Sequence, residues 1–214
     1  MDFFGQCPAG LAVPWLEDVA GNVDDIEAEQ RALLLEKALL SAGLFGRQDL
    51  ASHLVIQLET ALRELDANRL GVVAAQLTGA VRNLRRFGLH SQFRQLLDLL
   101  QNSVQGRSID ATVARLHVAG GLAAAGDLSQ ARPAIEQGFD ALDDGILVMD
   151  RLRITRSLAD ALSQTPLSEA TEGLLRLRAQ LPHITDSMST NSHFCLSVVA
   201  FVESLVLGYV SEDL

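Results

Sequence analysis

The sequence feature that most constrains the fold is a run of small residues interrupted by a Gly-Asp pair. Residues 119–131 read Ala-Gly-Gly-Leu-Ala-Ala-Ala-Gly-Asp-Leu-Ser-Gln-Ala. Gly126 can adopt the left-handed conformation that ends a helix, and Asp127 can accept hydrogen bonds from the free amides of the next helix. The alanines and glycines, Gly120-Gly121 among them, allow two helices to pack closely. The stretch therefore predicts a helix–turn–helix corner.

The same corner recurs along the chain. It is occupied in turn by Gly46, Gly88, Gly126 and Thr165. Five residues after each corner stand Ala51, Phe93, Ala131 and Ala170. The corners are separated by about forty residues, which is enough for one helix pair, and such a period is typical of stacked helical repeats. The repeat therefore predicts a short α-solenoid, with an irregular helical bundle as the alternative.

The composition also favours helices. Of the 214 residues 48% are apolar but only 5% are aromatic, so the core must be built from Leu, Ala and Val. Ala and Leu are among the strongest helix formers, whereas strands favour β-branched and aromatic residues. We therefore expect an all-α fold. The expected helices cover residues 24–44, 49–65, 68–87, 90–104, 109–125, 128–142, 146–163, 166–181 and 190–210.

Three regions are expected. Residues 1–23 contain two prolines and three glycines and are predicted to form an irregular cap. Residues 24–181 are predicted to form four helix pairs, with Asp24 or Asp25 capping the first helix and Thr165 capping the last. Residues 182–214 are predicted to form a loop and an apolar helix.

The predicted helix 190–210 is apolar nearly all round, which is typical of a helix that is buried on most sides. It either is the central helix or is covered by another protomer, by a partner, or by residues beyond this chain.

The third corner resembles a known helical repeat. Val118, Ala119 and Leu122 suit its first helix, and Gly126-Asp127 followed by Ala131 and Ile135 suits its second. This pattern is similar to tetratricopeptide repeats, while the longer period also resembles HEAT-type repeats. The resemblance extends over residues 31–181 and implies a groove that holds a segment of another protein.

Charge and cysteine content exclude several classes. The net charge of −10 argues against a nucleic-acid-binding surface. Cys7 and Cys195 are too few for a disulfide framework or a zinc site. The chain has no signal-peptide pattern and no apolar stretch of comfortable spanning length, so we expect a soluble cytoplasmic protein. Lys37 is the single lysine among seventeen basic residues, a bias that is typical of a GC-rich bacterial genome.

No catalytic or metal-binding pattern is present in the sequence. His193 and Cys195 are two residues apart and so point to different faces of a helix, and His183 lies upstream. The sequence has neither a Gly-x-Ser-x-Gly motif nor a phosphate-binding glycine loop. We therefore expect no enzyme activity, no cofactor and no metal, with Cys195 in the core and His193 partly exposed.

One arginine-rich face suggests a binding site. Arg82, Arg85 and Arg86 share a helix face, and Arg offers a planar fork for carboxylates. We assign partner binding to these three residues and Thr78, with an acidic segment of another protein as the expected partner. A looser basic group is expected to form a solvated face: Arg151, Arg153, Arg156, Arg176 and Arg178. The predicted function is a protein-interaction module or scaffold. The alternative is an assembly subunit that forms homo-oligomers through helix 190–210.

Overall fold

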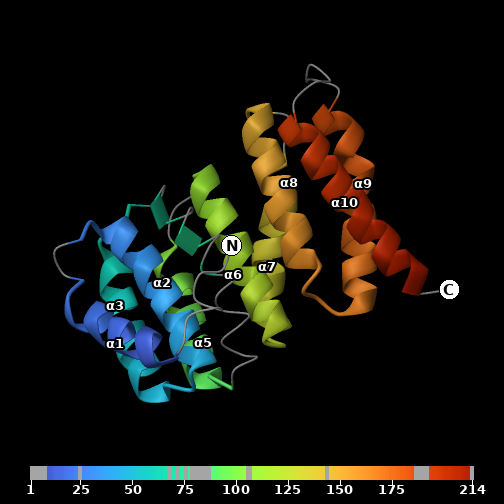
Figure 1. Cartoon of the computed structure of the whole chain (residues 1–214). Helices are drawn as coiled ribbons and strands as arrows, with labels where there is room; N and C mark the ends of the chain where they lie inside the picture. The colour runs from blue at the N-terminus through green and yellow to red at the C-terminus, as the bar shows by residue number, and fades with distance from the viewer. Residues whose placement is uncertain are drawn as a thin grey trace. The chain divides into compact units, whose positions relative to one another are not determined.

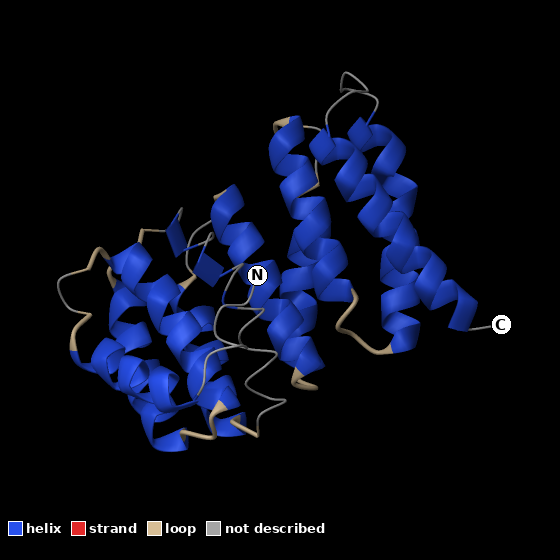
Figure 2. Cartoon of the chain, in the orientation of Figure 1, coloured by secondary structure: helices blue, strands red, loops and turns tan. Residues whose placement is uncertain are grey.

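The computed structural model confirms the all-α fold. The residues that it describes are 9–23, 26–66, 69–70, 73–74, 77, 88–104, 108–142, 145–185 and 193–212. These residues form α-helices and the loops between them (Figure 2). The chain divides into two compact units, residues 1–106 and 107–214, and each is described here by itself.

The unit 1–106 is built on one antiparallel helix pair. Its helices are α1 (Ala9–Gly21), α2 (Ala28–Leu44), α3 (Gln48–Arg63) and α5 (His90–Ser103) (Figure 1). α2 packs along α3, α1 contacts both of them, and α3 also contacts α5. Most of the predicted helix 68–87 lies outside the described residues.

The unit 107–214 repeats the same arrangement further along the chain. Its helices are α6 (Ile109–Ala124), α7 (Leu128–Asp140), α8 (Val148–Leu162), α9 (Leu167–Thr185) and α10 (His193–Glu212). α6 packs on α7 and on α8, and α8 packs on α9 and α10, which also contact each other (Figure 1). Helices that follow each other in the chain therefore contact each other, and α6 with α8 and α8 with α10 also pack side by side.

The predicted glycine corners are confirmed. Gly46, Gly88 and Gly126 have positive φ angles of 67°, 77° and 85°. At the third corner the amide of Asp127 donates to the Leu122 carbonyl at 2.9 Å, which closes the end of α6. The corner at Gly46 closes in the same way. A residue with a Cβ atom would be strained in this conformation, and this explains the glycine at each of these corners.

Small residues bring the paired helices together as expected. Ala51, Ala131 and Ala170, each five residues after a corner, are fully buried. In α6 a Cβ atom added to Gly120 would lie 3.3 Å from the Cα atom of Ala161 in α8. Gly120 therefore serves close helix packing, which confirms that the double glycine is no phosphate loop.

The expectation of an irregular N-terminal cap is wrong over residues 9–21. These residues form α1, with Pro14 inside the helix. A proline there removes one backbone donor and disfavours the helix. Leu16 and Val19 of the same helix are buried, and α1 contacts α2 and α3. The burial of this apolar face offsets the cost of the proline.

Two predicted helix caps differ in detail. Asp127 does occupy the N-cap position of α7, but its carboxylate accepts hydrogen bonds from the side chains of Ser129 and Gln130 rather than from a backbone amide. The hydroxyl of Thr165 donates back to the Leu162 carbonyl at 2.7 Å. The side chains at these corners therefore stabilise the turn through bonds other than the predicted ones.

Two predicted boundaries are also wrong. α2 begins after Glu27, so Asp24 and Asp25, which lie outside the described residues, precede its N-cap. The predicted loop at 182–189 starts later than expected, because α9 continues to Thr185 with Pro182 in its last turns. A proline near a helix end costs little, since few hydrogen bonds remain to be lost there.

The apolar helix α10 is covered on one side only. It contacts α8 and α9, and the hydroxyl of Tyr209 donates to the Ser163 carbonyl at 2.5 Å. Leu196 and Leu207, however, are 56% and 68% exposed. Within the described chain this helix is therefore not central, while its covering by another protomer, a partner or further residues stays a prediction. Within the described residues, no helix combines the length and the apolar character needed to cross a bilayer.

Candidate functional site

The residues assigned to partner binding from the sequence cannot be placed. Arg82, Arg85, Arg86 and Thr78 lie outside the described residues, so their binding of an acidic segment stays a prediction.

The expected side-chain environments near the C-terminus are confirmed. Cys195 is buried and His193 is exposed. In the described part of the chain, no three His, Cys, Asp or Glu side chains are grouped closely enough to hold a metal ion.

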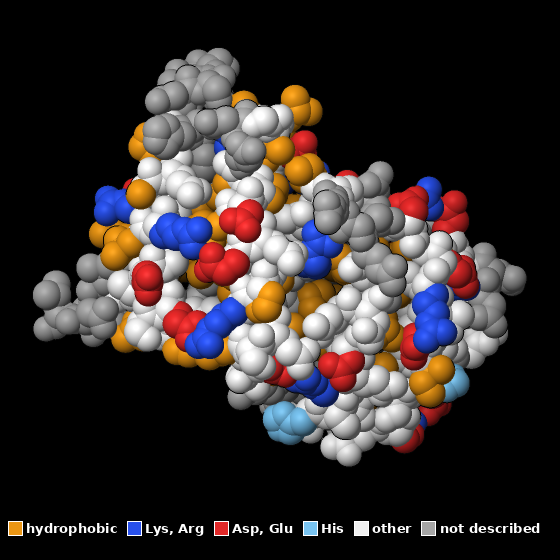
Figure 3. Space-filling model, turned by 180° about the vertical axis from the view of Figure 1, so that it is seen from behind, with side chains coloured by type: hydrophobic (Ala, Val, Ile, Leu, Met, Phe, Trp, Pro, Cys, Tyr) orange, Lys and Arg blue, Asp and Glu red, His pale blue; other side chains and the backbone are white. Residues whose placement is uncertain are grey.

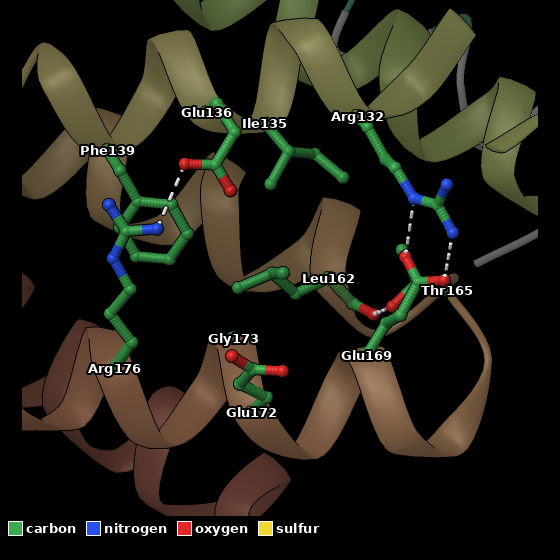
Figure 4. Close-up of a pocket in the computed structure, with 10 residues that line it drawn as sticks. All are labelled: Arg132, Ile135, Glu136, Phe139, Leu162, Thr165, Glu169, Glu172, Gly173 and Arg176. Atoms are coloured by element: carbon green, nitrogen blue, oxygen red, sulfur yellow. Dashed lines mark hydrogen bonds and ion pairs between the residues drawn. The ribbon is translucent and has the colours of Figure 1, made fainter. Parts of the chain in front are cut away.

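A groove in the unit 107–214 is the best candidate for a site. It lies between α7 and α9, above the end of α8, and encloses about 370 Å³ (Figure 4). Its lining residues are Arg132, Ile135, Glu136, Phe139, Leu162, Thr165, Glu169, Glu172, Gly173 and Arg176. The volume is near the lower end of the range of about 300–1,000 Å³ that is usual for ligand pockets.

The floor of the groove is apolar. Ile135, Phe139 and Leu162 are each at most 5% exposed and point between the two helices (Figure 4). A Cβ atom added to Gly173 would lie 2.4 Å from Cδ2 of Leu162, so the leucine packs directly against the backbone of α9. The absence of a side chain at Gly173 lets α8 and α9 approach each other, and the groove forms above this contact.

An ion pair with two hydrogen bonds joins the N-terminal halves of α7 and α9. Nε of Arg132 lies 3.1 Å from Oε2 of Glu169, and Nη2 lies 2.6 Å from Oε1. Hydrogen bonding to the guanidinium lowers the pKa of Glu169, and the carboxylate raises the pKa of Arg132. Such fork-to-fork pairing fixes orientation as well as distance.

A second ion pair joins the two helices further along. Nη1 of Arg176 lies 3.0 Å from Oε2 of Glu136. The Arg176 guanidinium also lies 3.8 Å from the centre of the Phe139 ring, which is a cation–π contact. Arg176 therefore covers one end of the floor and holds it against α9 (Figure 4).

The fifth charged residue of the groove has a different environment. Glu172 is exposed and makes no hydrogen bond or ion pair with any residue that the structure describes. Its carboxylate lies between the two ion pairs (Figure 4). Since the two arginines balance two of the three glutamates, the groove keeps a formal charge of −1 at Glu172.

The looser basic group identified in the sequence does not form a free basic face. Arg153 pairs with Asp110 of α6, and Arg178 lies 2.9 Å from Glu203 of α10. Arg151 is 5% exposed. On the face that Figure 3 shows, basic side chains lie next to acidic ones. Arg156, Arg176 and Arg178 are exposed, as expected, whereas Arg151 is not. Since Arg153, Arg176 and Arg178 pair with acidic side chains, the face is largely solvated but its charge is mostly balanced.

The groove has only a weak signal in the sequence. Arg132 stands six residues after Gly126, and Glu169 stands four residues after the next corner, Thr165. These opposite charges meet when the helix pairs stack. Their distances from the corners therefore identify the pair only once the stacking is known.

The groove combines an apolar floor with charged side chains at its rim. Its lining contains three apolar side chains and a glycine, two guanidiniums and three carboxylates. No His or Cys side chain is among the lining residues. The Thr165 hydroxyl is engaged by the Leu162 carbonyl. Paired charges of this kind orient a ligand but supply neither an activated nucleophile nor a positioned acid–base pair.

The comparisons with known proteins give a family without an assigned activity. No curated protein and no solved structure matches the chain. One family profile matches over residues 1–214. The chain therefore belongs to the family described as Domain of unknown function (DUF8586).

Proposed function

We propose that this protein is a non-catalytic interaction module that holds a short segment of a partner protein in the α7–α9 groove. The observation that carries the proposal is the groove itself, an apolar floor under a charged rim. Protein-binding sites commonly combine an apolar centre, which supplies affinity, with a polar rim, which supplies orientation.

The two ion pairs make the groove a preformed site. Arg132–Glu169 and Glu136–Arg176 join α7 to α9 at two points, and the cavity of about 370 Å³ lies between them above the apolar floor. A ligand that enters such a site does not need to order the helices first. Preformed geometry of this kind lowers the entropic cost of binding.

The proposal is tested by selecting peptides from a random phage-displayed library on the full-length chain. Hydrogen–deuterium exchange of the chain is then measured with and without a selected synthetic peptide. We expect slower exchange over α7 and the N-terminal half of α9, because a bound segment covers their facing sides. Failure to enrich any peptide, or protection confined to other helices, would contradict the proposal.

A second candidate function, self-assembly through α10, is favoured by the exposed side of that helix. Leu196 and Leu207 are exposed there, together with Ala200 and Ser204. Glu203, the charged residue between Leu196 and Leu207 in the sequence, is paired with Arg178. In a chain of net charge −10, two copies repel each other least where their surfaces carry no free charge. This side of α10 therefore suits a second copy of the chain.

Analytical ultracentrifugation tests this second candidate. If α10 forms a dimer contact, Leu207→Glu places a charge in it and shifts the chain towards the monomer. Leu175→Glu on α9 is the matched control, since Leu175 is also an exposed leucine. A wild-type chain that is monomeric at high concentration would contradict assembly through α10.

A further inference from the structure

The two ion pairs limit how a partner can enter the groove. Both cross from α7 to α9, one at Arg132 and the other at Arg176 (Figure 4). From Glu169 to Arg176, the α9 members of the two pairs, the helix axis advances about 10 Å, at 1.5 Å per residue. A helix with side chains is itself about 10–12 Å wide, so it cannot lie along the floor between the pairs. A partner must therefore insert a side chain.

The lining defines the chemistry of that side chain. Ile135 and Leu162 offer an apolar surface at the bottom, while Glu172 offers a carboxylate at the rim. A side chain that satisfies both has an aliphatic stem and a cationic end. Lysine and arginine have this structure and commonly bury the stem while the charged end stays in a polar environment.

The charges of the groove favour a cation over an anion. The other four charged side chains are already paired, which leaves Glu172 as the carboxylate available to a ligand. An acidic ligand would have to displace Glu136 or Glu169 from its arginine and would be repelled by Glu172. The net charge of −10 adds a long-range attraction for basic segments.

We infer that the α7–α9 groove binds a lysine or arginine side chain of an exposed segment of a partner protein. The stem lies against Ile135 and Leu162, and the charged end pairs with Glu172. This inference rests on the proposed function and adds to it the chemical class of the partner segment.

The test uses the full-length ¹⁵N-labelled chain and capped single amino acids observed by NMR. The first probe is Nα-acetyl-lysine methylamide, whose side-chain ammonium is free. The other two are the norleucine analogue, which lacks the ammonium, and the glutamate analogue. We expect the lysine probe to shift amides of α7 and α9 around the groove at the lowest concentration. Glu172→Gln is expected to weaken the affinity for the lysine probe about two- to fivefold, which is the effect of losing an exposed ion pair. Asp140→Asn makes the same charge change at an exposed position of α7 outside the groove. We expect it to leave the affinity for the lysine probe unchanged.

Three results would overturn the inference. The norleucine probe could bind as tightly as the lysine probe, the glutamate probe could bind best, or Glu172→Gln could have no effect. Each of these leaves the groove as a binding site and so leaves the proposed function standing. If no probe shifts the groove amides although selected peptides protect α7 and α9 from exchange, the inference fails alone. If instead the peptide selection and the exchange experiment fail, the proposed function is contradicted, and the inference that rests on it is contradicted as well.

Discussion

Two helix contacts at matching places of the chain differ in their chemistry. In the unit 1–106, Nε2 of Gln92 in α5 donates to Oγ of Ser52 in α3 at 2.9 Å. In the unit 107–214, Arg132 of α7 pairs with Glu169 of α9. Ser52 and Arg132 each stand six residues after a corner, and Gln92 and Glu169 each stand four residues after the next one. The corners therefore bring the same positions together in both units.

The side chains at those positions determine what the contact can do. Neutral side chains join α3 to α5, whereas charged ones join α7 to α9 above an apolar floor. Ten residues after the corner the unit 1–106 has the exposed Ile56, where the unit 107–214 has Glu136 in its second ion pair. The comparison shows that backbone corners can repeat while the side chains on one helix surface decide whether a charged groove forms between the helices.

The largest effect is expected from removing the groove floor. Leu162 is 3% exposed, and Leu162→Ala is expected to lower the free energy of unfolding by about 2–5 kcal/mol, because it leaves a cavity. Urea unfolding followed by circular dichroism measures this loss. Leu58→Ala in α3 is the matched control, since Leu58 is fully buried in the other unit. We expect it to cost as much stability but to leave peptide binding in the groove unchanged; equal loss of peptide binding would show that the floor is not specific to the site.

A smaller and equal effect is expected at the two corners. Gly46→Ala and Gly126→Ala force a Cβ atom into a left-handed backbone, which costs about 1–2 kcal/mol. No heavy atom lies within 4 Å of the added Cβ at either position, so backbone strain accounts for the whole effect. Urea unfolding of the two variants tests this. A clear difference between them would show that the corners are not equivalent in energy.

Among the described residues, the unit 1–106 has a buried carboxylate and the unit 107–214 has none, which gives a pH-dependent prediction. Glu36 of α2 is 2% exposed, and desolvation raises its pKa although Oε2 lies 3.3 Å from Nζ of Lys37. Above the raised pKa the buried charge destabilises the fold, while below the unfolded value of 4.5 the group is protonated in both states and the penalty disappears. Glu36→Gln is therefore expected to stabilise the chain by about 1 kcal/mol at pH 7 and by less at pH 4.

Thermal unfolding at the two pH values measures the effect of Glu36→Gln. The exposed Glu27→Gln in the same unit is the control, since its side chain loses little water on folding. Equal stabilisation at both pH values would show that the charge of Glu36 is not the cause.

The sequence predicted the elements of this fold better than the use of its side chains. Helix periodicity and the glycine corners placed most helices within a few residues, because a left-handed Gly followed by a buried Ala has a local cause that is visible in the chain. α1 was missed because the cost of Pro14 is local, whereas the burial of Leu16 depends on helices further along.

The candidate site was not predicted for a related reason. Arg176 was assigned to a solvated face and is exposed, but its contacts with Glu136 and Phe139, forty and thirty-seven residues earlier in the chain, were not predicted. Such a contact is set by the stacking of helix pairs and has no local pattern. Only the alignment of charges to the corners relates it to the sequence, and that alignment needs the stacking to be known.

The smallest effect is expected from exchanging the chemistry of one contact for that of the other. The double variant Arg132→Ser, Glu169→Gln gives the α7–α9 contact the residues of the α3–α5 contact. Both replaced side chains are solvent-accessible, so we expect the melting temperature to fall by about 2 °C or less at low salt. The difference from the wild-type chain should vanish at high salt, where exposed charges are screened.

The pH dependence identifies the ion pair as the source of this small difference. The pKa of Glu169 is lowered in the folded chain, so its pairing with Arg132 stabilises the fold above the unfolded pKa of 4.5. That contribution is lost as the pH falls through the lowered value. Melting curves of the wild-type chain and the double variant should therefore differ at pH 7 and converge in acid. A difference that persists in acid or at high salt would mean that packing of the arginine stem, rather than its charge, holds α7 against α9.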